Sequence, residues 1–266
     1  MTSRIAVGGR GLFGARRTDV VLRRAGGATT LLGARRTAWT IVDGLRTTTL
    51  RVGDRKVSCV EHLFAALGAL GAYEGLAVDV EGEPPLELPL LDGGAREWCG
   101  AVRALDVPAA RPPLVVVRDG EVSIGESLYV FRRTDAGVRR VSVRVEFPPH
   151  ASDAAWDGTA YDFVARIAPA RTFVAARDLD LLLARGAAPE VDPSSVLILA
   201  DEGRVHATGV PFTADEPARH KLLDLIGDLF VHGGPPEGSV HAARPSHAGT
   251  HAAIVEALAA GTLAYD

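Results

Sequence analysis

Histidine and aspartate stand one helical turn apart near the end of the chain, a spacing that suits metal binding. His220, Asp224 and Asp228 occupy positions i, i+4 and i+8, so a helix would place all three on one face. An imidazole and a carboxylate one turn apart can reach the same ion. Apolar residues of the same segment recur at helical spacing and predict that helix: Leu222, Leu223, Ile226, Leu229 and Phe230.

The His-x-x-x-Asp pattern alone has a plainer interpretation, because solvated helix faces often carry the same residues. A second segment favours the metal: Glu61 and His62 stand side by side at the start of another apolar helix. Two histidines and one aspartate form the ligand set of a catalytic zinc, whose fourth position is left for water. Glu61 would then be the neighbouring general base, and iron(II) would fit the same ligands.

The composition excludes several classes of protein. A chain of 266 residues with 47% hydrophobic and 23% charged residues can form one large globular domain or two of ordinary size. The net charge of −4 argues against a general nucleic-acid binder. The N-terminus has no apolar signal region, and no stretch is long enough to cross a bilayer. Because Cys59 and Cys99 imply no disulfide framework, we expect a cytoplasmic protein. We also expect a monomer.

The elements that must position these residues come as groups of strands and groups of helices. Strands are predicted from short apolar or alternating runs over residues 18–24, 37–42, 76–80, 114–117, 140–147 and 196–199, with a hairpin arm over 120–131. Helices are predicted over residues 61–72, 95–105, 161–168, 177–185 and 246–260, besides the central segment. In the helix over 177–185, Leu179, Leu182 and Leu183 are expected to point inward. The glycine-rich residues 8–14 are interpreted as a tight strand connection, because no helix pattern follows them as a dinucleotide fingerprint requires.

Three prolines within residues 106–113 mark the best linker candidate, since proline cannot continue a helix or sit within a central strand. We therefore expect two α+β domains. Residues 1–108 would carry the Glu-His motif, and residues 112–266 would carry the central helix. Strands followed by helices, twice, predict two similar layers, each a sheet backed by helices.

Five separated motifs together resemble one enzyme family. They occur in this order: Ser58-Cys59-Val60-Glu61-His62-Leu63, Leu88-Pro89-Leu90-Leu91-Asp92-Gly93, Ala170-Arg171-Thr172-Phe173, His220-Lys221-Leu222-Leu223-Asp224-Leu225-Ile226-Gly227-Asp228-Leu229 and Ser246-His247. Over nearly the whole chain the sequence is similar to the UDP-3-O-acyl-N-acetylglucosamine deacetylases, the zinc amidases of lipid A biosynthesis. The resemblance implies two β-α-α-β layers packed against each other with the active site between them, in agreement with the predicted elements.

The resemblance implies a ligand set, a base and an acid. His62, His220 and Asp224 correspond to the zinc ligands of the family. Glu61 corresponds to the base that takes a proton from the water at the zinc, whose pKa the metal lowers to about 7 in favourable sites. His247, in the second predicted domain, corresponds to the other catalytic residue, which as a cation can stabilise the oxyanion and protonate the leaving amine.

Five further residues correspond to supporting positions of the family. Asp228 corresponds to the carboxylate that orients the catalytic histidine and favours its charged form. Thr172 corresponds to the hydroxyl that joins the zinc in holding the tetrahedral oxyanion. Lys221 corresponds to a residue facing the diphosphate of a UDP-linked acylated amino sugar, where a flexible cation suits phosphate oxygens. Phe147 and Phe173 correspond to aromatic positions in the substrate cleft, although a core role is equally plausible for either.

The remaining histidines and Cys59 have simpler interpretations. Histidines in predicted loops are expected to be solvated: His150, His206, His232 and His241. His251 lies one turn after His247, where the family usually has an amide, so a supporting role for it has only weak support. Cys59 is interpreted as a small packed residue, as buried free cysteines usually are.

Two segments depart from the family pattern. Residues 9–15 match an early glycine motif without its histidine, and residues 186–195 lack the usual glycine-serine and asparagine pattern beside the acyl-chain passage. The chain also ends early. Retained catalytic groups beside altered loops leave three hypotheses open: deacetylation of UDP-3-O-acyl-N-acetylglucosamine, deacetylation of another acetylated amino sugar or amide by a divergent member, and a metal-stabilised binding paralogue without catalysis.

Overall fold

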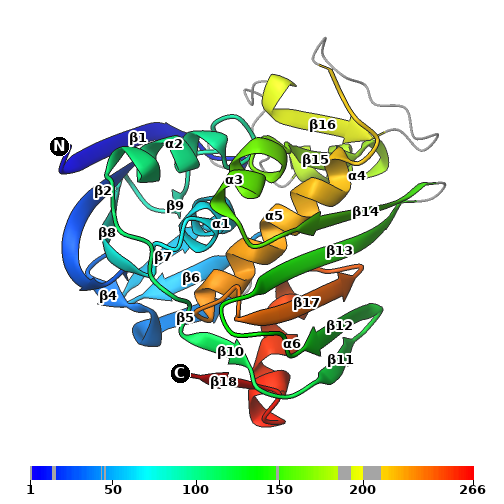
Figure 1. Cartoon of the computed structure of the whole chain (residues 1–266). Coiled ribbons are helices and arrows are strands. Elements are labelled where there is room, and N and C mark those ends of the chain that lie inside the picture. The colour runs from blue at the N-terminus through cyan, green and yellow to red at the C-terminus, as the bar shows by residue number, and fades with distance from the viewer. Residues whose placement is uncertain are drawn as a thin grey trace.

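The computed structural model describes residues 2–13, 16–42, 44, 46–147, 150–184, 193–199 and 211–266. Helices and mixed sheets both contribute to it, so the predicted α+β class is confirmed. Helix α5 (Glu216–Val231) crosses the middle of the molecule, with strands of the N-terminal half on one side and strands of the C-terminal half on the other (Figure 1).

Two sheets are built from strands that precede residue 90. The larger has the order β1 (Arg4–Arg10), β2 (Arg17–Ala28), β8 (Glu74–Glu81), β3 (Thr30–Leu31) and β4 (Ala34–Arg35). The smaller has the order β5 (Trp39–Val42), β6 (Thr49–Val52), β7 (Arg55–Ser58) and β9 (Leu86–Glu87). Leu76, Val78 and Val80 alternate along β8 and are buried, because every second side chain of a strand points to the same face.

The larger sheet of the C-terminal half also has five strands. Its order is β11 (Gly120–Ile124), β12 (Ser127–Arg132), β17 (Gly238–Ala243), β13 (Arg139–Phe147) and β14 (His150–Trp156). The pair β13–β17 is parallel and the other neighbours are antiparallel. Two short pairs flank the sheet: β10 (Leu114–Val116) with β18 (Leu263–Tyr265), and β15 (Thr172–Ala175) with β16 (Val196–Leu199).

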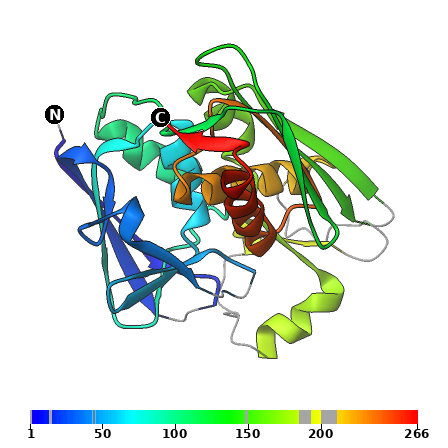
Figure 2. The same cartoon turned by 90° about the horizontal axis from the view of Figure 1, so that it is seen from below.

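The helices lie mainly between the sheets. They are α1 (Glu61–Ala69), α2 (Arg96–Ala104), α3 (Ala160–Asp162) continued by the π-helix η2 (Phe163–Ile167), α4 (Ala176–Ala184), α5, and α6 (His247–Ala259), with 3-10 turns η1 (Arg36–Ala38) and η3 (Pro193–Ser195). Seen from below, the cyan α1, the orange α5 and the red α6 fill the space between the blue N-terminal strands and the green C-terminal strands (Figure 2). This places the starts of α1 and α6 near the middle of α5.

Helices α1 and α5 form the closest helix pair of the core. A Cβ on Gly227 would lie 2.0 Å from the carbonyl oxygen of Glu61, so only glycine permits this approach. Phe64 of α1 meets Phe230 of α5 edge to face with ring centroids 5.1 Å apart, and Trp39 of β5 stacks with Phe64 at 5.3 Å. The glycine contact and the aromatic cluster together fix the position of the Glu-His motif against α5.

The predicted linker agrees with the observed chain path. Residues 106–113 contain no helix or strand, and each sheet of the described residues takes all its strands from one side of that segment. Helix α5 nevertheless packs against α1 of the N-terminal half as well as against β13 and β14. The division into domains 1–108 and 112–266 stays a prediction.

Strand β17 lies in the middle of the C-terminal sheet, where the sequence predicted no strand. Its residues are mostly small, and Val240 is the single β-branched residue among them. The strand is stabilised by two neighbours that are distant in sequence, β12 and β13, so its local pattern carries little signal.

The expectation of solvated loop histidines was wrong for His232, and two others, His150 and His241, lie in strands instead of loops. His232 is buried, with 8% of its surface exposed, at the end of α5. His241 lies in β17, where its Nδ1 is 2.9 Å from the Ser142 hydroxyl, and His150 begins β14. His206 lies outside the described residues.

One expectation for helix α4 was also wrong. Leu183 was expected to point inward, but 45% of its surface is exposed. It lines the cavity described below, so this leucine faces a space open to a ligand instead of the protein core. The side chains of the other two inward leucines of that expectation, Leu179 and Leu182, lie outside the description.

Candidate metal centre and catalytic site

A cavity of about 1040 Å³ lies between the two halves of the chain. Most residues that the sequence singled out line it: Glu61, His62, Thr172, Phe173, His220, Lys221, Asp224 and His247. Asp228 lies behind the wall, with 1% of its surface exposed. Phe147 ends β13, and its side chain lies outside the description, so its place in the cleft stays a prediction.

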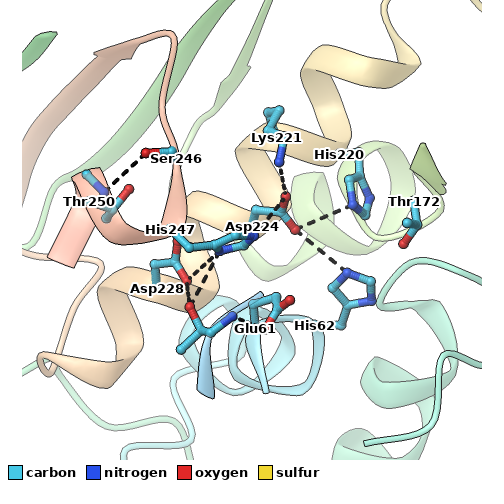
Figure 3. Close-up of polar contacts among 12 residues, drawn as sticks. Glu61, His62, Thr172, His220, Lys221, Asp224, Asp228, Ser246, His247 and Thr250 are labelled. Atoms are coloured by element: carbon cyan, nitrogen blue, oxygen red, sulfur yellow. Dashed lines mark hydrogen bonds and ion pairs between the residues drawn. The ribbon is translucent and has the colours of Figure 1, made fainter. Parts of the chain in front are cut away.

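Three buried side chains converge at one point of the wall. His62 from the start of α1 meets His220 and Asp224 from consecutive turns of α5, and one donor atom of each lies within 4.8 Å of the others (Figure 3). Asp224 Oδ1 is 3.4 Å from His220 Nε2 and 3.7 Å from His62 Nε2. These separations suit donors around a shared ion, and the predicted three residues are brought together.

The charge states of this cluster fit a divalent cation. Burial lowers the pKa of His62 to about 3 and lowers that of His220, so both imidazoles are neutral and have a lone pair to offer. Burial would raise the pKa of Asp224, but His220 and Lys221 outweigh it and lower that pKa. His220 Nδ1 donates to the Ala170 carbonyl at 3.1 Å, which leaves Nε2 as the free donor atom.

Glu61 stands beside this cluster at the first residue of α1. Its carboxylate accepts a hydrogen bond from the backbone N–H of Thr48 at 3.0 Å, and 4% of the residue is exposed. Burial raises the pKa of Glu61 to about 8, against the lowering influence of His247. A carboxylate whose pKa lies in the neutral range is suited to general-base work near pH 7.

His247 begins α6 and reaches the opposite side of the cluster. Its Nδ1 donates to Asp228 Oδ2 at 2.9 Å, and its Nε2 lies 3.8 Å from Asp224 Oδ2. Burial would lower the pKa of His247, but the Asp228 carboxylate and its hydrogen bond outweigh burial and raise the pKa to about 9. His247 is therefore a cation at neutral pH, as a general acid must be before it donates a proton.

Three further predicted residues lie beside the cluster and line the cavity. Lys221 Nζ donates to Asp224 Oδ2 at 2.8 Å and lies 5.6 Å from the centroid of the Phe173 ring. Thr172 lies beside His220 in Figure 3, and its hydroxyl donates to the Gly93 carbonyl at 2.9 Å. The structure thus brings Lys221, Phe173 and Thr172 to the cavity, while their contacts with a substrate stay predictions.

The arginine of the Ala-Arg-Thr-Phe motif has a structural function. Arg171 is buried, and its guanidinium forms an ion pair with Glu216 at the start of α5, with Nε–Oε1 at 2.7 Å. The pair joins the beginning of β15 to α5. Since His220 bonds to the carbonyl of Ala170, the same segment also orients a candidate metal ligand.

Cys59, predicted to be a small packed residue, lies at the wall of the cavity. It is half-buried, has a left-handed backbone with φ of 57°, and lines the cavity. Its thiol donates to Glu87 Oε1 at 3.2 Å, and burial holds the pKa of the thiol well above its usual range. A protonated thiol is a poor nucleophile and a poor metal ligand.

Sequence reasoning missed Thr48 and His232 and gave His251 only weak support. All three are buried behind His247 and linked by hydrogen bonds. Thr48 precedes β6 in a run of three threonines, and no pattern in the sequence connects that run to α6. The contacts that connect Thr48 with Asp228 and His251 span about 200 residues, so local spacing held no signal for them.

Comparisons with known proteins agree with the geometry. The family model of UDP-3-O-acyl N-acetylglycosamine deacetylase matches residues 2–260. A relative from Thermosynechococcus vestitus named UDP-3-O-acyl-N-acetylglucosamine deacetylase is 33% identical over 80% of this chain and 73% of its own length. Relatives of the same name from Anaeromyxobacter dehalogenans (32% identity, 82% and 71% covered) and Brucella ovis (33%, 75% and 70%) are similarly close.

Among the described helices, none is long and apolar enough to cross a membrane. The match over nearly the whole chain and the identities above 30% establish the relationship independently of the site geometry. The predicted resemblance is thereby confirmed, and the chain belongs to the UDP-3-O-acyl N-acetylglycosamine deacetylase family.

Proposed function

We propose that this protein hydrolyses the N-acetyl group of UDP-3-O-acyl-N-acetylglucosamine, as a step of lipid A biosynthesis, with zinc held by His62, His220 and Asp224. One observation carries the proposal: this donor cluster, the Glu61 carboxylate and the charged His247 meet at a single cavity. The relatives that bear the name of this activity support the same choice of substrate.

The proton transfers fall to two side chains of opposite charge. A divalent cation at the cluster would supply Lewis acidity toward the amide carbonyl and would make water more acidic. Glu61, when ionised, accepts a proton from the water that attacks the acetyl carbon. His247 donates its proton to the amide nitrogen as the C–N bond breaks, so the products are acetate and the free amine.

The cavity offers two kinds of surface to such a substrate. Its lining includes apolar side chains that could cover an acyl chain: Leu12, Ile41, Val174, Leu183, Val196 and Ile198. Lys221 also lines the cavity, beside Asp224, and presents an ammonium that suits a diphosphate. The Coulomb attraction and the hydrogen bond of Asp224 raise the pKa of Lys221 despite its burial, so it is charged at neutral pH.

The test is release of acetate from UDP-3-O-acyl-N-acetylglucosamine by the purified, zinc-loaded protein. We expect turnover that is lost in Glu61→Gln while the zinc content stays the same. Absence of acetate from the metal-loaded wild-type protein would remove this substrate assignment. A screen of other acetylated nucleotide sugars would then decide whether the altered residues 9–15 and 186–195 accompany a different amide substrate.

A binding paralogue without catalysis is the competing hypothesis from another class. A merely structural metal would not require Glu61 or a charged His247 beside it. In cells that depend on this gene, that hypothesis expects Glu61→Gln to support growth as well as the wild type does. The deacetylase proposal expects loss of growth in the same experiment.

The identity of the metal belongs to the proposal as well. Two imidazoles and one carboxylate favour zinc, and iron(II) accepts the same donors. Metal analysis of protein purified without chelators separates the two. The cytoplasmic location and the monomeric state expected from the sequence stay predictions, and size-exclusion chromatography with light scattering tests the latter.

A further inference from the structure

A series of buried hydrogen bonds runs behind His247, away from the candidate metal cluster. Asp228, which holds His247, has its Oδ1 atom 2.5 Å from the Thr48 hydroxyl. The same hydroxyl oxygen lies 3.0 Å from His251 Nε2, and His251 Nδ1 lies 3.0 Å from His232 Nε2. The proposed mechanism uses none of Thr48, His251 and His232, although all three are buried.

The charges of these groups fix the direction of each bond. Asp228 is ionised and can only accept, because His247 outweighs burial and lowers the pKa of its carboxyl. The single proton of the Thr48 hydroxyl therefore goes to Asp228 Oδ1. The hydroxyl oxygen must then accept from His251, so Nε2 of His251 carries a proton.

The contact between His251 and His232 determines which ring nitrogen of His232 carries a proton. Burial lowers the pKa of His251 and lowers that of His232 to about 3, so both rings are neutral. A neutral His251 that is protonated at Nε2 has a bare Nδ1, which accepts from Nε2–H of His232. All donors along this path point toward Asp228, and each proton is used once.

Thr48 also reaches the other side of the reaction. Its backbone N–H donates to Glu61 Oε2 at 3.0 Å, while its side chain donates to Asp228. The residue comes directly before β6, whose pairing with β5 and β7 fixes its backbone. One residue therefore contacts both the candidate base and the carboxylate that holds the candidate acid.

We propose that Thr48, oriented by the His251–His232 pair, is a positioning residue that sets the geometry of Glu61 and of the Asp228–His247 pair together. The proposal rests on the proposed deacetylase function. The Thr48 hydroxyl bonds to Oδ1 of Asp228, and Nδ1 of His247 lies 2.9 Å from Oδ2 and 3.1 Å from Oδ1 of the same carboxylate. The imidazole is thereby held with its Nε2 facing the cavity, where a leaving amine would lie.

Thr48→Val distinguishes the effect of the Thr48 hydroxyl from that of its backbone N–H. Valine has nearly the shape of threonine and keeps the N–H that Glu61 accepts, but it cannot donate to Asp228. Because hydrogen bonds to charged groups contribute more than neutral ones, we expect kcat to fall by about tenfold to a hundredfold. KM and zinc content should stay within about twofold of the wild type. Thr48→Ser, which keeps the hydroxyl, should retain most of kcat.

A second pair of variants tests the hydrogen bond that His251 donates to the Thr48 hydroxyl. In His251→Gln the amide Nε2–H can replace the imidazole donor, whereas His251→Leu removes it. We expect His251→Leu to lower kcat by about two- to tenfold, as the loss of one neutral hydrogen bond would, and His251→Gln to restore most of it. Since His251 acts through the hydroxyl, Thr48→Val/His251→Leu should lose no more activity than Thr48→Val alone.

The protonation pattern has a readout that is independent of turnover. Correlation spectra of the imidazole nitrogens in the zinc-loaded protein should show His251 and His232 protonated at Nε2 and bare at Nδ1. His241→Gln, in the remote pair with Ser142, is the matched control: it should remove one ring from the spectra and leave kcat unchanged. In Thr48→Val the signal of His251 Nε2 should shift.

Three results would overturn the proposal. One is a His251 ring protonated at Nδ1. Another is a kcat of Thr48→Val equal to that of the wild type, and the third is a double variant whose loss equals the product of the single losses. Acetate release by the wild-type protein tests the proposed function alone, whereas the ratios between variants and the ring tautomers test the positioning. The two failures are therefore distinguishable.

Discussion

His62 and His247 face the same cavity, yet at neutral pH the first is neutral and the second is a cation. Burial acts on both rings and lowers the pKa of His62 to about 3. The Asp228 carboxylate outweighs the same burial at His247 and raises its pKa to about 9. The neutral ring suits a metal ligand and the charged ring suits a proton donor, so one carboxylate separates two chemical roles.

The first prediction concerns metal content. Removing a ligand leaves two donors, so His220→Ala and Asp224→Ala should each lose at least about tenfold in zinc affinity. Even the loss of a residue that only hydrogen-bonds to a metal ligand usually costs about that much. Glu61→Gln should keep the wild-type affinity, since the carboxamide replaces a base and not a donor. Titration with a competing chelator measures all three. If Glu61→Gln lost zinc as completely as His62→Ala, Glu61 would be a ligand.

The second prediction concerns pH. Hydrolysis requires ionised Glu61 and cationic His247, so kcat/KM should rise with pH as Glu61 ionises and should fall as the pH rises through the His247 pKa of about 9. Asp228→Asn removes the charge that raises this pKa. The alkaline limb should therefore move to lower pH, toward the value of about 6.5 of a free imidazole, while zinc content stays normal.

His247→Gln is the control for the pH profile. It should abolish the alkaline limb of His247 and lower kcat by about a hundredfold or more, the usual size of a general-acid contribution. The acid limb reports the base together with the water at the metal. It is not diagnostic in Asp228→Asn, because the Asp228 charge also raises the pKa of Glu61. Unchanged profiles in both variants would exclude His247 from the mechanism.

The candidate ligands were predictable because their spacing is local. His220 and Asp224 are one turn apart, and the Glu61-His62 pair opens its own helix. Nothing of that kind marked Thr48, whose partners are met only after the chain has folded across 180 residues or more. The family resemblance supplied the roles of the reacting groups, and the residues that orient them came from the structure.

At the scale of the elements, the contact between α1 and α5 sets the distance between base and ligands. Glu61 and His62 begin α1, and the turn of α5 that faces them carries Gly227. The cavity wall is thus formed where two helix backbones come close, with no side chain between them. A substitution that separates the helices should disturb the fold and the site together.

The third prediction tests that contact. Gly227→Ala would place a methyl group 2.0 Å from the Glu61 carbonyl oxygen, so the helices must move apart. We expect the free energy of unfolding to fall by about 1–3 kcal/mol, as overpacking in a core usually costs, and kcat to fall with it. Denaturant unfolding and acetate release measure the two effects.

Gly100→Ala is the matched control on α2. No atom lies within 4 Å of a Cβ built there, and the residue is exposed. Alanine in place of glycine within an unhindered helix should raise the free energy of unfolding by about 0.5–1 kcal/mol and leave kcat unchanged. Equal stability of the two variants would show that the helices are not in tight contact at Gly227.

The elements that were predicted and those that were missed differ in their local pattern. Val141, Val143 and Val145 alternate along β13, and their buried face could be read from the sequence. Strand β17, with its alanines and serine, forms because β12 and β13 offer it hydrogen bonds on both sides. Leu183 was misassigned for another reason, since helical spacing cannot distinguish a leucine that faces the core from one that lines a cavity.

At the scale of the whole molecule, the candidate ligands come from both sides of the 106–113 segment. His62 belongs to the N-terminal half, and His220 and Asp224 belong to the C-terminal half. The candidate acid, His247, also depends on both halves, because Thr48 of the first half bonds to Asp228 of the second, and Asp228 holds His247. The site is therefore complete only when the two halves are packed together, and its geometry reports on that packing.

The last prediction follows from this arrangement. A cation that binds His62 together with His220 and Asp224 joins the two halves and binds the native state alone, so it should stabilise the fold. The stabilisation is about 4 kcal/mol when free zinc exceeds its dissociation constant a thousandfold. Removal of the metal with a chelator should lower the melting temperature by several degrees, and added zinc should restore it.

The ligand variant shows whether that effect belongs to the candidate centre. Asp224→Ala should gain clearly less melting temperature from added zinc than the wild type does, because the remaining two imidazoles bind it more weakly. Glu61→Gln keeps all three donors and should respond to zinc as the wild type does. If the wild-type protein bound zinc with no change in melting temperature, its zinc would bind native and unfolded chains equally, and a preformed centre between the halves would be excluded.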